Sequence, residues 1–240
     1  MFESTVLLAA LLIFLGSFVQ TAIGFGLAIV AAPLLFQLSP QYVPAPICIV
    51  ALVISIINAF KLRSSVSIGG LKSAIIGRVP GSLLGGFLLT VVSGATLSLW
   101  LGIMVLIAVA ISALPYRLKP TPKRMLIAGF MSGVMGTSSS IGGPPMALLM
   151  QHEEAAKLRG NLSAFFVITS LMSLFVLFFY GHFTIDHIMI TLPLLPAALM
   201  GYGLANKVVH RIPQHSMRIL ALLLCLVSGL TAIIQGLAGF

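Results

Sequence analysis

Two apolar runs in this sequence are too long for one membrane crossing, and each contains a break near its middle. The runs cover residues 5–36 and 124–150, whereas about 20 apolar residues suffice to cross a bilayer. The second break reads VMGTSSSIGGPP (residues 134–145), and serine, glycine and proline all weaken a helix. Lipid cannot satisfy freed backbone groups, so irregular backbone at that depth must lie inside protein or against water. Each run is therefore expected to be a kinked crossing or a hairpin that returns to the side it entered.

Six further apolar runs are each long enough to cross a membrane once. They cover residues 43–60, 66–91, 96–115, 161–181, 185–206 and 216–237. Charged residues make up 7% of the 240 residues, against about 25% in a soluble domain. The sequence thus predicts an all-α, polytopic integral membrane protein. Its 13 lysines and arginines fall in short clusters between the apolar runs, so the expected partner is the lipid bilayer and not nucleic acid.

The positions of the basic residues distinguish the two topologies. Lysine and arginine mark the cytoplasmic loops of membrane proteins. They gather in four loops, at residues 61–63, 116–124, 157–159 and 207–218. If all eight runs cross once, 116–124 and 207–218 lie on opposite sides, which breaks this rule. If the two long runs are hairpins, every basic loop lies inside, and both termini are predicted to lie outside.

The hairpin topology divides the chain into two similar halves, residues 1–117 and 118–240. Each half then contains one hairpin and three crossings, and because three is odd the second half is inverted relative to the first. GFGLAIVAAP (24–33) aligns with GTSSSIGGPP (136–145), and PGSLLGGFL (80–88) aligns with PAALMGYGL (196–204). Inverted repeats are typical of transporters, in which the substrate site lies at the repeat interface near the bilayer midplane.

The segments GFGLAIVAAPLL (24–35), PGSLLGG (80–86) and GTSSSIGGPPMALL (136–149) resemble the TauE/SafE sulfite exporter family, and the resemblance spans the whole chain. It implies a transporter that exports small sulfur-containing anions, such as sulfite or organosulfonates, across a prokaryotic inner membrane. The first break here carries alanines and the second carries serines, so the resemblance leaves the identity of the anion open.

Both breaks are predicted to contact an anionic substrate. A helix that starts after a break presents free N–H groups and a positive dipole end, which suit an anion. Arg78 lies deep in its run, where a cation must face a cavity, a partner or a headgroup, and its planar fork suits an oxyanion. The candidate substrate-binding residues are Gln20, Gly24, Phe25, Gly26, Arg78, Thr137, Ser138, Ser139, Ser140, Gly142 and Gly143.

These residues also have plain structural interpretations. The hydroxyls of the second break can cap helix ends, and Gln20 can form a hydrogen bond between helices. Gly77, Gly81 and Gly85 recur every fourth residue, and this spacing predicts close helix packing.

No aspartate or glutamate is expected in the membrane interior, because Glu153, Glu154 and Asp186 lie at the boundaries, so no proton-carrying carboxylate is evident. Moving an anion out of a negative-inside cell is favoured by about 2.3 kcal/mol per 100 mV. The sequence therefore favours an exporter, and an anion channel, an ion-coupled importer and a membrane scaffold are the alternatives. An intramembrane enzyme would need a general base near Ser138–Ser140, and none is apparent, so we expect no enzyme activity, no metal and no cofactor. A homodimer remains open.

Overall fold

The described residues of the computed structural model are 2–67, 71–92, 94–113, 119–150 and 153–209, with separate residues between 219 and 238. These residues form ten α-helices, joined by turns and short 3-10 segments, and contain no strand. The helices are α1 (Phe2–Ile23), α2 (Leu27–Leu38), α3 (Ala45–Lys61), α4 (Lys72–Val91), α5 (Gly94–Ala113), α6 (Pro122–Ser139), α7 (Gly143–Met150), α8 (Ala155–Phe179), α9 (Ile185–Thr191) and α10 (Leu195–Val208).

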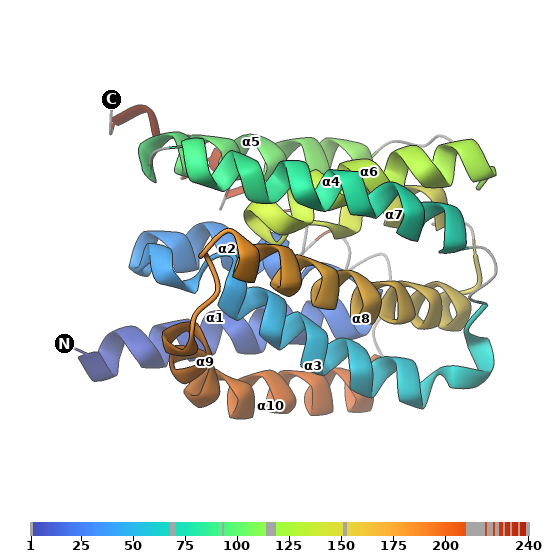
Figure 1. The fold of residues 1–240 in the computed structure, drawn as a ribbon. Coiled ribbons are helices and arrows are strands. Elements are labelled where there is room, and N and C mark those ends of the chain that lie inside the picture. Colours follow the sequence, from blue (N-terminus) through green and yellow to red (C-terminus); the bar gives the residue numbers. More distant parts are fainter. Residues whose placement is uncertain are drawn as a thin grey trace.

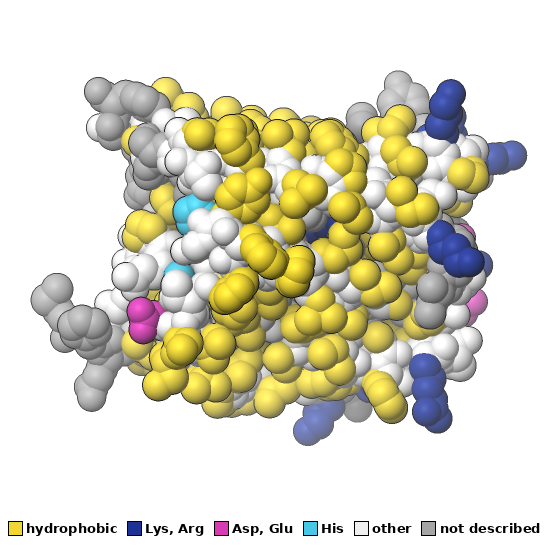
Figure 2. Space-filling model, in the orientation of Figure 1, with side chains coloured by type: hydrophobic (Ala, Val, Ile, Leu, Met, Phe, Trp, Pro, Cys, Tyr) yellow, Lys and Arg dark blue, Asp and Glu magenta, His cyan; other side chains and the backbone are white. Residues whose placement is uncertain are grey.

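Five segments in the described part of the chain are long and apolar enough to cross a membrane. They are Thr5–Ile23, Pro40–Lys61, Lys72–Val91, Ala155–Phe179 and Ile185–Val208. Large apolar side chains point outward from them, and apolar side chains spread over the middle of the face in Figure 2. A soluble protein rarely exposes such a surface, whereas lipid solvates it. The predicted all-α, multi-pass membrane protein is thus confirmed.

Both long apolar runs reverse direction at their breaks (Figure 1). α2 begins beside Gly16 and runs back along α1 toward the N-terminus of α1, and the shorter α7 turns back from the end of α6. The first reversal uses Gly24 and Gly26, with φ of 103° and 121°, a region that glycine enters freely. The second reversal uses Ser140, with φ of 64°. Both runs are therefore hairpins and not kinked crossings.

The described lysines and arginines other than Arg78 lie at one end of the bundle (Figures 1 and 2). This end holds the last turn of α3 and the first turns of α6 and α8, and we call it the basic end. The Nζ of Lys61 donates to the Oδ1 of Asn206 over 2.8 Å, which ties the ends of α3 and α10 together there. The start of α1 and the turn between α8 and α9 lie at the opposite end.

α4 and α6 run parallel and touch backbone to backbone at glycines. Gly77, Gly81 and Gly85 of α4 face Leu126, Phe130 and Val134 of α6, in that order. A Cβ at Gly129 of α6 would overlap the carbonyl oxygen of Ala74. The four-residue glycine spacing therefore reflects close packing, as expected. α1 packs against α10 in a similar way, because a Cβ at Gly201 would overlap the carbonyl oxygen of Phe14.

Two expectations extend beyond the described residues. The predicted boundary between the halves, at 117/118, lies outside them, and the inverted repeat stays a prediction. The last run, 216–237, is described only in part, where its residues are helical and Gly229 packs against Val105 and Leu106 of α5.

We predict that Gly129→Ala lowers the melting temperature of the purified protein by several degrees, because the added methyl forces α4 and α6 apart and such overpacking costs about 1–3 kcal/mol. Differential scanning fluorimetry in detergent measures the change. Gly203→Ala in α10 is the control, because a Cβ there meets no atom within 4 Å. Equal melting temperatures for the two variants would contradict the packing argument.

Candidate functional site

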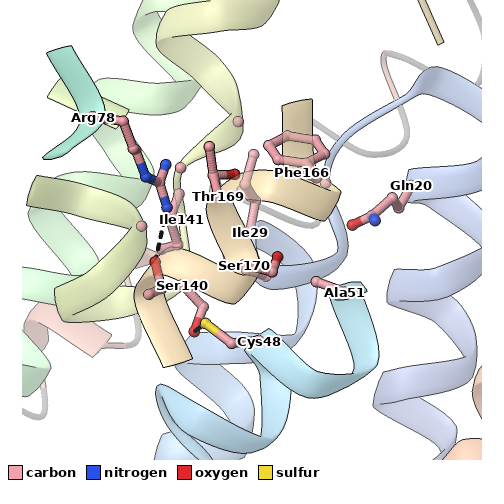
Figure 3. A pocket seen from close by; sticks show the side chains of 16 residues that line it. Gln20, Ile29, Cys48, Ala51, Arg78, Ser140, Ile141, Phe166, Thr169 and Ser170 are labelled. Carbon is pink, nitrogen blue, oxygen red and sulfur yellow. Dashed lines mark hydrogen bonds between the residues drawn. The ribbon is translucent and has the colours of Figure 1, made fainter. Parts of the chain in front are cut away.

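The two breaks meet at one cavity of about 40 Å³, measured as the volume open to the centre of a water-sized sphere (Figure 3). Its walls come from both hairpins and from α3, α4 and α8. The lining residues are Gln20, Gly26, Ala28, Ile29, Cys48, Ala51, Arg78, Gly136, Ser140, Ile141, Gly142, Gly143, Phe166, Thr169, Ser170 and Ser173. Parts of both sequence halves that are far apart in the chain thus surround one small space.

Arg78 of α4 brings the cation to this cavity, with its side chain 3% exposed. Its Nη1 donates to the carbonyl oxygen of Ser132 over 2.6 Å and to the Oγ of the same residue. Its Nη2 donates to the Oγ of Ser173 over 2.9 Å, so α6 and α8 both hold the guanidinium. The buried Nε has no hydrogen-bond partner.

Two glycines make room for the guanidinium. A Cβ at Gly136 would lie 2.5 Å from Nη2 of Arg78, and a Cβ at Gly142 would lie 2.7 Å from Nη1. Gly136 precedes the turn of the second hairpin and Gly142 follows it, so the guanidinium lies beside this turn. Any larger residue at either position would displace the cation from the cavity wall.

The charge of Arg78 is not neutralised by a carboxylate within the described residues. Their only ion pair joins Lys157 and Glu153, 2.8 Å apart and at the basic end. A buried, unpaired cation is unfavourable in an apolar interior, and a bound anion relieves that penalty. The chemistry of the cavity therefore favours a small anion.

The four hydroxyls of the second break have different partners. The hydroxyls of Ser138 and Ser139 donate to the carbonyl oxygens of Val134 and Met135, one turn back on α6. Thr137 shares a hydrogen bond of 2.9 Å with Ser173. Ser140 alone of the four lines the cavity, and its hydroxyl donates to the carbonyl oxygen of Pro44 over 2.9 Å.

The first break contributes backbone and one amide side chain. Gln20 lines the cavity, and its Nε2 donates to the Oγ of Ser55 over 3.3 Å. Gly26 also lines it, as do Ala28 and Ile29 in the first turn of α2, where no side chain caps the helix. The N-terminus of α2 therefore faces the cavity with its positive dipole end.

The predicted site residues thus separate into two groups. Gln20, Gly26, Arg78, Ser140, Gly142 and Gly143 line the cavity, whereas Gly24, Phe25, Thr137, Ser138 and Ser139 do not. α7 also offers fewer N–H donors than expected, because Pro144 and Pro145 in its first turn have none.

Sequence reasoning missed the contributions of α3 and α8. Cys48 lines the cavity with its Sγ 3.6 Å from the Oγ of Ser140. Thr169, Ser170 and Ser173 line it from α8. These three hydroxyl residues cluster within an apolar run, and this pattern could have indicated a polar face turned toward a cavity. Among the described residues, no three His, Cys, Asp or Glu side chains gather as a metal site would require.

A comparison with protein-family models matches residues 8–232 of the chain to the model described as "Sulfite exporter TauE/SafE". No curated protein and no solved structure matches the chain.

We predict that Ser132→Ala lowers the melting temperature by several degrees, because it removes a partner of the Arg78 guanidinium and such a loss costs about 1–3 kcal/mol. Ser82→Ala is the matched control, since Ser82 is also fully buried but its hydroxyl has no partner. Thermal unfolding followed by intrinsic fluorescence measures both variants. A larger loss for Ser82→Ala would contradict the assigned role of Ser132.

Proposed function

The chain belongs to the sulfite exporter TauE/SafE family, and from this premise we propose that it exports small sulfur-containing anions, sulfite or organosulfonates, from the cytoplasm. The substrate would bind in the cavity between the two breaks. The observation that carries this proposal is Arg78, a buried cation on the cavity wall that no carboxylate of the described residues contacts. As a membrane transporter the protein would need no enzyme activity and no cofactor.

The cavity suits a compact oxyanion. Only about 40 Å³ is open to the centre of a water-sized sphere, so the cavity suits an anion of a few heavy atoms. Arg78 supplies the charge, and the hydroxyl of Ser170 faces the same space, with Gln20 also on the cavity wall (Figure 3). An oxyanion accepts several hydrogen bonds at once, which matches such a set of donors.

The membrane potential gives the expected direction of transport. No aspartate or glutamate is among the residues that line the cavity. Without a proton carrier, anions follow the potential, which in a negative-inside cell favours export by about 2.3 kcal/mol per 100 mV. An anion channel is the nearest alternative, and an ion-coupled importer would need a cation site elsewhere.

We further propose that the basic end faces the cytoplasm of a prokaryotic cell and that both termini lie outside its inner membrane. The positive-inside rule supports this orientation. Alternating access by two inverted repeats is part of the same proposal. In its support, the long helix of each hairpin packs on a glycine of a second helix, α6 on α4 and α1 on α10.

We predict that Arg78→Gln lowers sulfite flux into or out of proteoliposomes about 10- to 100-fold, the loss expected when a charge-assisted hydrogen bond worth about 1.5–3 kcal/mol is removed. Flux is measured with an imposed potential and no ion gradient. Lys72→Gln is the control, because Lys72 begins the same helix but is exposed at the basic end.

Gel filtration of the purified variants establishes that they remain folded. Arg78→Lys keeps the charge but not the planar fork, and it should recover part of the flux. Wild-type flux in folded Arg78→Gln would reject the site. Flux that appears only with a sodium or proton gradient would instead indicate a coupled carrier.

The orientation has its own test. Alkaline phosphatase fused after Phe240 should be active, because it folds only outside the cytoplasm, whereas green fluorescent protein fused there should be dark. A fusion that ends after Thr121, directly before α6, should give the reverse pattern. The opposite result at both sites would invert the proposed topology.

A further inference from the structure

α8 leads from the basic end to the buried cation. It begins at Ala155, and Arg159, Phe166 and Ser173 follow at intervals of seven residues, two helical turns each. At 1.5 Å per residue, Phe166 lies about 10 Å inward of Arg159, and Ser173 lies about 10 Å further. Phe166 and Ser173 both line the cavity, and Ser173 holds the guanidinium of Arg78. Going inward along one face of α8, Arg159 comes first, then the ring of Phe166, and then Ser173 beside Arg78.

Phe166 lies near Phe25 of the first break. Both side chains approach Gly143, where a Cβ would lie 2.9 Å from the Cβ of Phe25 and 3.3 Å from a ring carbon of Phe166. The aromatic pair therefore joins the first break, the second break and α8. Figure 3 shows the ring of Phe166 on one side of the cavity and Cys48 on the other.

Arg159 lies on the outer side of this pair, beside the first break. A Cβ at Gly24 would lie 3.3 Å from the Cγ of Arg159, so the side chain covers the turn that ends α1. Its Nε donates to the carbonyl oxygen of Ala155 over 3.4 Å. Within the described residues it has no ion pair, because Glu153 pairs with Lys157.

We propose that anions reach the cavity from the basic end along α8, with Arg159 as the first cationic contact and the Phe25–Phe166 pair as the constriction. Arg159 selects for negative charge before the anion is desolvated, and the aromatic pair limits its size. This route rests on the proposed function for its substrate and not for its geometry. It assigns specificity to Arg159, Phe25 and Phe166, none of which forms a hydrogen bond with Arg78.

Cys48 provides a reporter for the route. The chain has two cysteines, so Cys225→Ser leaves Cys48 as the only thiol. In a methanethiosulfonate reagent, the thiolate attacks the sulfenyl sulfur, a disulfide forms and methanesulfinate leaves. 2-Sulfonatoethyl methanethiosulfonate is an anion, and methyl methanethiosulfonate is neutral, so the pair separates charge selection from intrinsic reactivity.

The experiment measures the rate of Cys48 modification in inside-out vesicles, by intact mass of the full-length protein. We expect Phe166→Ala to raise the rate for both reagents several-fold. Arg159→Gln should lower the rate for the anionic reagent about fivefold, the attraction of one unit charge at ~4 Å in water, and leave the neutral reagent unchanged. Phe166→Leu replaces Phe166→Ala if the alanine variant fails gel filtration.

Two matched controls lie on or beside the same stretch of chain. Lys157→Gln removes an equal charge two residues from Arg159, from an exposed side chain that already pairs with Glu153. Phe175→Ala removes an aromatic ring from α8 that is 65% exposed on the outer surface. Both should leave the modification rates unchanged.

Three results would overturn the route. Cys48 could react faster with the anionic reagent from the opposite side of the membrane, the Phe166 variants could leave the rate unchanged, or Lys157→Gln could match Arg159→Gln. The route and the proposed substrate fail separately. If Cys48 is modified as expected but no sulfite flux is measured, only sulfite is rejected as the substrate. If sulfite flux is measured but the rate of Cys48 modification does not depend on Phe166 and Arg159, only the route is rejected.

Discussion

A single buried guanidinium sets the architecture around the cavity. Burying the charge of Arg78 among apolar helices is unfavourable unless hydrogen bonds and a counter-charge compensate it. Ser132 and Ser173 supply hydrogen bonds from two helices, and Gly136 and Gly142 leave the space that the guanidinium fills. The counter-charge is what the described residues lack, and an anionic substrate would supply it.

The two hairpins reverse direction beside the same cavity, but they use different residues to do so. The first break uses glycines with positive φ and leaves the first turn of α2 uncapped beside the cavity. The second places Ser140 in the left-handed region and follows it with two prolines, which remove donors from α7. The first hairpin therefore contributes amide groups and a helix dipole, and the second contributes a hydroxyl and the space for the cation. Neither break alone would form the site.

The sequence was sufficient for the membrane class, both reversals and the position of Arg78 beside a cavity, because hydropathy, basic loops and a charge in an apolar run are local signals. It was insufficient for the hydroxyls of the second break. Serine fits both a helix and a turn, and α6 continues to Ser139, so Ser138 and Ser139 bond to carbonyls of their own helix. The role of Ser173 could not be predicted either, because its contact with Arg78 joins residues 95 positions apart and depends on how α4 and α8 pack.

The glycine contacts between α4 and α6 also restrict how this protein can move. Backbones in direct contact leave no layer of side chains that could repack, so we expect the two helices to move together. Arg78 lies on α4, and its cradle at Gly136 lies on α6, so the cation and its surroundings travel together. If access to the cavity changes, we expect the change on the wall formed by α2 and α3, which meets the second break through contacts such as that of Cys48 with Ser140.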